Sequence, residues 1–232
     1  MLSYILIKNE RGRLIMNKLK QIKKEAENEA YLYFHENIRP LPKTKEGNWD
    51  FKTGEFINND VDAFRHTYVS GVFTQKFSEA AANILGQLKE LEGDLKRNQP
   101  PEQKNMDLWN NQVGRKYGSI SSTKSELAKL IQNALTKGEL IISIDQEKDS
   151  RSYQDSDYSS LIDSNKPIIV VEENETGRNE WFLDLTKGTL LSRDQFVQEI
   201  GSGNYPGYLV ADINNISTPM SKPDGVSANN LG

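Results

Sequence analysis

The polar run from Asp145 to Lys166, "DQEKDSRSYQDSDYSSLIDSNK", constrains the fold more than any other stretch of the chain. It is rich in Asp and Ser and has few large apolar side chains, so burial within it offsets little of the entropy lost on ordering. The apolar pattern is helical before this run and strand-like after it. We therefore predict a linker, residues 146–166, between an all-helical domain, residues 17–145, and a small α+β module, residues 167–232.

Before the linker, apolar residues recur at helical spacing between turns rich in proline, glycine and asparagine. Thr123 and Glu126 have the spacing of a capping box, and "ELIISI" is expected to form a short strand. The second predicted helix has glycines near its end, Gly86 and Gly93, where we expect an interruption. The predicted helices span residues 17–37, 60–96, 106–117 and 123–137.

After the linker, "PIIVVEE" and "EWFLDLT" have the pattern of two paired strands around a turn. Ser192 is placed to cap a helix that runs through Ile200. "YLVADINN" and "ISTPM" then predict two more strands. The module is thus predicted to have a ββαββ order, which makes the whole chain a mainly α-helical N-terminal domain followed by a small α+β module.

Composition excludes several classes of protein. With 36% hydrophobic and 27% charged residues and a net charge of −4, the chain lacks the basic surplus of a nucleic-acid binder. The lysines between Lys18 and Lys24 are followed at once by Glu25, Glu27 and Glu29, so we interpret this run as a solvated helix face. No apolar stretch has the length of a membrane span.

The first residues, 1–16, are interpreted as an N-terminal extension, with Met16 as a second candidate start. Their sequence, "MLSYILIKNERGRLIM", is too short and too interrupted for a secretion signal. We therefore expect a protein that is cytoplasmic as synthesised, and export by a route without a signal peptide is the alternative. The absence of cysteine leaves the redox compartment open.

The stretch "NNDVDAFRHTYVSGVFTQKF" begins with charged residues and then becomes apolar. At helical spacing, Asp62, Arg65 and His66 fall within about a third of the circumference, on the side that also carries Val69 and Phe73. Ionisable groups on a buried face need partners. Asp62 is therefore expected to pair with Arg65 and to accept a hydrogen bond from His66.

A second helix, "MDLWNNQVGRKYG", has a similar polar face. Asp107, Asn110, Asn111 and Gly114 share it, and two consecutive asparagines are poor choices for a helix interior. Such departures from local preference are expected at functional or strained sites. We predict that the two polar faces, together with Arg115, converge within hydrogen-bonding reach.

Two interpretations of this convergence stay open. In the first, the chain is a hydrolase: His66 is a general acid or base, and Asp62 and Asp107 are its catalytic carboxylates. Arg65 or Arg115 would bind an anionic group of a small-molecule, lipid or glycan substrate, with Asn110 and Asn111 positioning it. In the second, the polar cluster is a structural hydrogen-bond network in a non-enzymatic interaction protein, whose C-terminal module binds a protein partner.

We expect no resident cofactor. Two histidines and no cysteine argue against a zinc site, and His35 is interpreted as a cation favourable to the end of the first helix. A hard divalent cation held by Asp62, Asp107 and a glutamate is the alternative.

The segments "DAFRHTY", "MDLWNNQVGR" and "NALTKGEL" resemble an uncharacterised bacterial all-helical domain, over about residues 17–144. Members of that family often occur in secreted or toxin-like proteins, so the resemblance implies a hydrolytic effector. Members also tend to carry a His-Glu or similar acidic pair between the two motifs. Here the corresponding segment is "LKELEGD", which offers Glu90 or Glu92 as an additional acid and no histidine.

The tail, from about residue 167, is similar to a second uncharacterised module that ends in Pro-Asp-Gly and Asn-Asn-Leu. These residues lie in "SKPDGVSANNLG" at the end of the chain. On physical grounds Pro223, Asp224 and Gly225 are a turn signal that requires no chemistry.

Overall fold

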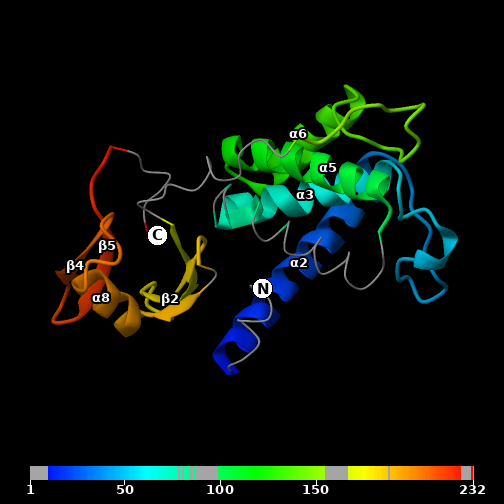
Figure 1. Cartoon of the computed structure of the whole chain (residues 1–232). Coiled ribbons are helices and arrows are strands. Elements are labelled where there is room, and N and C mark those ends of the chain that lie inside the picture. The colour runs from blue at the N-terminus through cyan, green and yellow to red at the C-terminus, as the bar shows by residue number, and fades with distance from the viewer. Residues whose placement is uncertain are drawn as a thin grey trace. The chain divides into compact units, whose positions relative to one another are not determined.

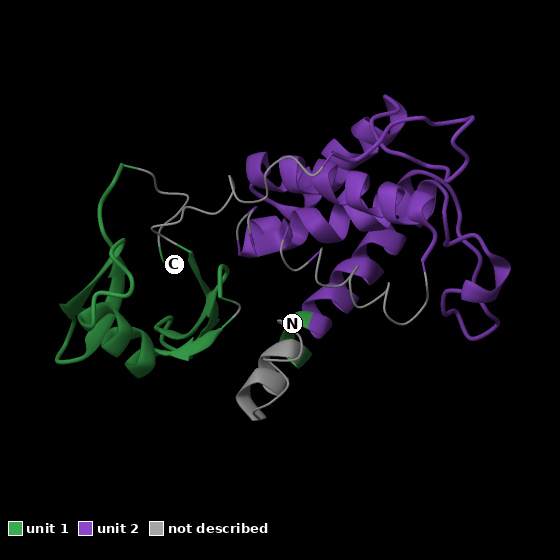
Figure 2. Cartoon of the chain, viewed as in Figure 1, with its two compact units in different colours: residues 1–19, 157–232 green, residues 20–156 purple. Residues whose placement is uncertain are grey.

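The computed structural model of the chain describes residues 10–77, 79, 81–83, 86, 99–154, 167–187, 189–225 and 231. The chain divides into two compact units, one of residues 20–156 and one of residues 1–19 and 157–232 (Figure 2). The prediction of a helical N-terminal part followed by a small α+β module is confirmed. None of the helices in the described ranges is long and apolar enough to cross a membrane.

Among the described residues, the helical part is built from α-helices and a short 3₁₀ helix whose ends follow local sequence signals (Figure 1). Pro101 occupies the first turn of its helix, where its missing N–H is not needed. The Thr123 side chain accepts from the Glu126 backbone N–H and so caps the last helix of this part, as predicted. The elements are α2 (Glu10–Asn37), η1 (Phe51–Thr53), α3 (Asp60–Lys76), α5 (Pro101–Ile120) and α6 (Lys124–Thr136).

The predicted helix over residues 60–96, with an interruption expected near Gly86 or Gly93, ends earlier than expected. Helix α3 ends at Lys76, and Phe77 has the non-helical angles φ −123° and ψ −55°. Helical backbone is found again at residues 79, 81–83 and 86. The break at Phe77 therefore comes before either glycine. Most of the rest of the predicted helix lies outside the described residues.

The predicted strand in "ELIISI" is also wrong. Leu140 and Ile141 are buried in the helical core instead. The side chain of Asn110 donates to the Ile141 carbonyl at 2.8 Å and accepts from the Ile141 N–H at 3.0 Å. The Asn110 amide thus makes the hydrogen bonds to Ile141 that a neighbouring strand would otherwise make. The apolar run in the sequence does not reveal this.

Helices α3 and α5 pack backbone against backbone (Figure 1). A Cβ on Gly114 would lie 2.1 Å from the carbonyl oxygen of Thr67, and one on Gly118 would lie 2.5 Å from that of Gly71. The close neighbour of Gly114 is therefore the backbone of α3. Contacts advance along both helices together, so α3 and α5 run parallel and bring their N-terminal polar residues to the same end.

The aromatic residues of α2 and α3 close the other side of this core. Phe34 meets Phe64 edge-on at 5.6 Å, and Tyr33 stacks on Phe64 at 5.7 Å. These residues belong to one cluster that also includes Leu127 and Ile131 of α6. Helix α2 therefore contributes to the same core as α3, which places its charged residues close to the start of α3.

The second unit has one strand more than predicted. Its elements are β1 (Ile168–Glu173), β2 (Asn179–Asp184), β3 (Leu190–Ser192), α8 (Arg193–Gly201), β4 (Tyr208–Asp212) and β5 (Ser217–Ser221). Strands β1-β2-β3 form one antiparallel sheet, and β4 and β5 form a separate hairpin. Ser192 caps α8 in a capping box with Gln195, as expected. The three-residue β3 runs directly into this cap, which hides it from a sequence pattern.

The first part of the predicted linker is tied to the helical unit. Arg151 donates to the backbone carbonyls of Gly138, Glu139 and Leu140, and its guanidinium lies 5.1 Å from the Trp109 ring centre. Residues 155–166 lie outside the described residues. At the other end of the chain, α2 begins at Glu10, so part of the predicted extension is helical.

Candidate functional site

An asparagine side chain caps the first turn of helix α3. The Asn59 side chain accepts from the N–H groups of Val61 and Asp62. Asn58, at a φ of 55°, donates its N–H to Asp62 Oδ2 at 2.9 Å. Local backbone geometry therefore fixes the Asp62 carboxylate, which is only 3% exposed.

Arg65 joins Asp62 to helix α2. Its Nη2 and Nε donate to Asp62 Oδ1 at 2.5 and 3.2 Å, and its Nη1 donates to Glu27 Oε1 at 3.1 Å. Burial alone would lower the pKa of Arg65, but the carboxylates of Asp62 and Glu27 outweigh it and raise that pKa above its ordinary value. The guanidinium is thus a permanent buried cation with two anionic partners.

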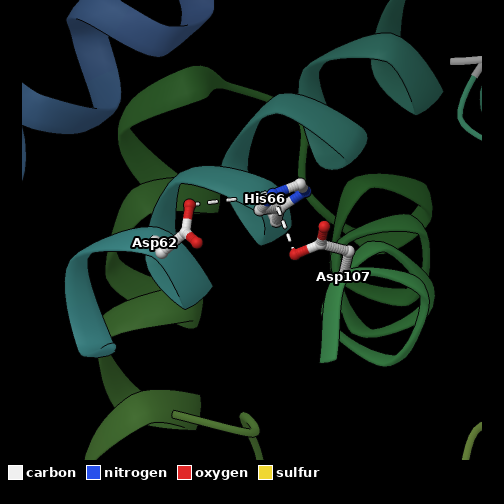
Figure 3. A group of neighbouring side chains, drawn as sticks. All are labelled: Asp62, His66 and Asp107. Carbon is white, nitrogen blue, oxygen red and sulfur yellow. Dashed lines mark ion pairs between the residues drawn. The ribbon is translucent and has the colours of Figure 1, made fainter. Parts of the chain in front are cut away.

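His66 lies where the polar ends of α3 and α5 meet (Figure 3). Its Nε2 is 3.1 Å from Asp107 Oδ1 and 3.7 Å from Asp62 Oδ1. These distances confirm that His66 of the first motif and Asp107 of the second lie within hydrogen-bonding reach. The same nitrogen lies 2.5 Å from Arg65 Nη2.

These contacts make opposite demands on His66 Nε2. A guanidinium only donates, so the contact with Arg65 requires Nε2 to be an unprotonated acceptor. A carboxylate accepts, so a hydrogen bond with Asp107 requires a protonated Nε2. Nε2 therefore carries no hydrogen when it accepts from Arg65 and carries one when it donates to Asp107, and either the neutral Nε2–H tautomer or the imidazolium supplies that hydrogen.

Asp107, in the first half of α5, mirrors Asp62. Its Oδ2 accepts from the Gln99 side-chain amide at 2.7 Å, while its Oδ1 faces His66. Asp107 is 3% exposed. In both acids, then, a neutral donor holds Oδ2 and the other oxygen faces the imidazole.

The remaining predicted residues have varied positions. Asn110 is completely buried and engaged at both ends of its amide with the peptide groups of Ile141. Asn111 is buried, and its backbone carbonyl accepts from Ser70 Oγ at 2.9 Å. Arg115 is buried further along α5. Glu90 and Glu92 lie outside the described residues.

Two contributors to the cluster were not predicted. Glu27 belongs to the charge run that we interpreted as a solvated helix face, yet it holds Arg65. Gln99 belongs to the proline-rich break between helices, yet it holds Asp107. Spacing along one helix signals neither contact, because Glu27 lies 38 positions before Arg65 on another helix and Gln99 lies before the start of α5.

The fold and the cluster define a class of domain: a helical module in which two parallel helices bring an Asp-Arg-His face and an Asp-Asn-Asn face together. Residues 43–139 match the family model of a domain of unknown function, DUF6973. This match contains both motifs and confirms the prediction of an uncharacterised domain family in the helical part. No solved structure matches the chain.

Proposed function

We propose that the helical domain is a hydrolase that acts on a substrate with an anionic group. The observation that carries this proposal is the position of His66 Nε2, within 3.7 Å of an oxygen of each of two buried carboxylates, Asp62 and Asp107. Strongly interacting titratable groups that are held apart from water are characteristic of catalytic sites.

In this proposal His66 carries the proton of the reaction. Asp107, the nearer acid, orients the imidazole and stabilises its protonated form. Asp62 holds Arg65, and the Arg65 guanidinium supplies positive charge for the anionic group of the substrate. Asn111 lies on the same helix one turn after Asp107 and is assigned a positioning role, whereas the amide of Asn110 is already engaged with Ile141.

A non-enzymatic interaction protein is the second candidate, and one observation favours it. The Asp62, His66 and Asp107 side chains are at most 8% exposed, and Arg65 already has two anionic partners. A network of this kind stabilises the crossing of two helices without any substrate. In this case the C-terminal module would carry the binding of a protein partner.

Expression in bacteria separates the two candidates. The wild-type chain and His66→Ala are produced in the cytoplasm and, with an added export signal, in the periplasm. Growth inhibition that requires His66 is expected for a hydrolytic effector. His35→Ala is the matched control, because His35 is the other histidine of the chain and accepts a hydrogen bond from the Leu41 N–H outside the cluster. Normal growth with the wild type in both compartments would contradict the effector.

A further inference from the structure

The three side chains of the cluster have the donor set of a metal site. Asp62, His66 and Asp107 each direct one ligand atom inward, and these atoms lie within 4.8 Å of one another. Two atoms bound to the same divalent cation at about 2.1 Å are roughly 3.0–3.4 Å apart. The His66–Asp107 distance of 3.1 Å already meets this requirement, and the His66–Asp62 distance of 3.7 Å is close to it.

The surroundings of the two carboxylates also suit ligands. Oδ2 of Asp62 accepts from a backbone N–H, and Oδ2 of Asp107 accepts from the Gln99 amide. These neutral donors orient each acid so that its Oδ1 faces His66 Nε2. Ligand carboxylates in metal sites are typically held in this way by a hydrogen bond to the oxygen that does not bind the ion.

The guanidinium of Arg65 already occupies part of the space between these three side chains. Arg65 Nη2 lies 2.5 Å from both Asp62 Oδ1 and His66 Nε2, which are two of the three ligand atoms. Arg65 also has a second anchor, since its Nη1 donates to Glu27. Arg65 can therefore leave the ligand atoms while it keeps Glu27 as a partly buried anionic partner.

We propose that Asp62, His66 and Asp107 form a binding site for a first-row divalent cation, and that this cation displaces Arg65 toward Glu27. An imidazole nitrogen with two carboxylate oxygens suits Mn²⁺ or Zn²⁺ better than Mg²⁺ or Ca²⁺. The inference does not depend on hydrolysis, because an interaction protein would hold the same ion. His66 Nε2 cannot hold the cation and transfer a proton at the same time. Cation binding is therefore measured in the absence of substrate.

The test is a titration of the full-length protein with Mn²⁺, followed by electron paramagnetic resonance of the free ion. The wild type is expected to bind one ion per chain. Asp107→Asn and His66→Gln should bind at least about tenfold more weakly, because each loses a ligand. Asp60→Asn is the matched control: it changes a carboxylate of the same helix turn that pairs with Arg39 instead. Its affinity for Mn²⁺ should equal that of the wild type.

Arg65→Met gives a result that misfolding does not imitate. It keeps an unbranched apolar side chain and removes the competing charge, so Mn²⁺ should bind roughly tenfold or more tightly than to the wild type. Mg²⁺ should compete only weakly in every variant. Absence of saturable Mn²⁺ binding by the wild type would overturn the proposal. So would binding that Asp107→Asn and His66→Gln leave unchanged, or an Arg65→Met affinity equal to or below that of the wild type.

Discussion

At the scale of single residues, the cluster shows how a buried charge finds its partners. Asp62 and Arg65 are three residues apart on one helix, so their pairing follows from local geometry. Glu27 completes the pairing from a different helix, 38 positions away. The Arg65 charge is thus satisfied by one local and one distant acid.

Asp62→Asn is expected to lower the free energy of unfolding of the helical unit by about 3 kcal/mol, because it breaks a buried ion pair and leaves Arg65 with Glu27 alone. Chemical denaturation checks this. Asp60→Asn serves as control, since the Asp60–Arg39 pair is partly exposed and its loss should cost under about 1 kcal/mol. Equal losses for the two variants would contradict a buried pair. If the cluster is catalytic, Asp62→Asn should also reduce activity by orders of magnitude.

In the second unit, Asp184 is a buried acid with a pH signature. Burial by itself raises the pKa of its carboxyl, but hydrogen bonds from Thr186, Tyr205 and the Lys187 backbone outweigh burial and lower that pKa. The stabilisation is therefore complete above about pH 4, the ordinary value for an aspartate, and is lost as pH falls through the lowered pKa.

We therefore expect Asp184→Asn to destabilise the second unit at pH 7 by about 1–3 kcal/mol, and the difference from the wild type to shrink as pH falls below about 4. Hydrogen exchange of the β2 amides, compared between variant and wild type at each pH, measures this. A difference that grew as pH fell would contradict the sign of the pKa shift.

At the scale of elements, the contact between α3 and α5 positions the cluster. Two glycines of α5 let the helix backbones touch, and this close approach brings Asp107 within 3.1 Å of His66. A residue that looks unfavourable in a helix interior is therefore favoured here by packing between helices.

Gly114→Ala is expected to destabilise the helical unit by about 3 kcal/mol or more, because its Cβ would lie 2.1 Å from the Thr67 carbonyl oxygen and the helices must separate. Thermal unfolding checks the loss, and Mn²⁺ affinity should fall with it. Gly86→Ala is the control, because among the described residues its Cβ would come no closer than 3.7 Å, an ordinary van der Waals contact with the Asn111 amide nitrogen. A neutral Gly114→Ala would show that the close contact between backbones is not required.

At the scale of the whole molecule, the boundary between the two units depends on how far the polar run from Asp145 to Lys166 stays hydrogen-bonded to the helical unit. Arg151 donates to the carbonyls of residues 138–140, and the Tyr153 N–H donates to Asn105 Oδ1, so the run is attached to the helical unit as far as Tyr153. The composition of residues 155–166 stays that of a linker. The division into an extension, a helical domain, a linker and a tail module remains a prediction in its finer boundaries.

Limited digestion with a protease of broad specificity is expected to cut first between about residues 155 and 166, where polar sequence offers few apolar anchors. The helical fragment should keep its fold and its Mn²⁺ affinity. In Arg151→Ala, which loses three hydrogen bonds to backbone carbonyls, cleavage should extend into residues 146–154. Resistance of the whole segment, with both units unfolding together, would indicate one integrated domain. Mass spectrometry of the fragments distinguishes these results.

The sequence by itself determined what depends on neighbours along the chain. Helix caps at Thr123 and Ser192, and the polar faces at the starts of α3 and α5, follow from short-range spacing. The same spacing also predicted that the two faces would need each other, because buried charges require partners.

Only the tertiary structure decided which groups the buried polar side chains pair with. Asn110 has an amide suited equally to a substrate or to a peptide group, and folding gave it the Ile141 peptide. The charge pattern predicted that Glu27 lies on a solvated helix face, but the packing of α2 beside α3 brings it to Arg65. Such choices depend on the distance between backbones that are far apart in sequence, and here glycines that remove the steric barrier between α3 and α5 set that distance.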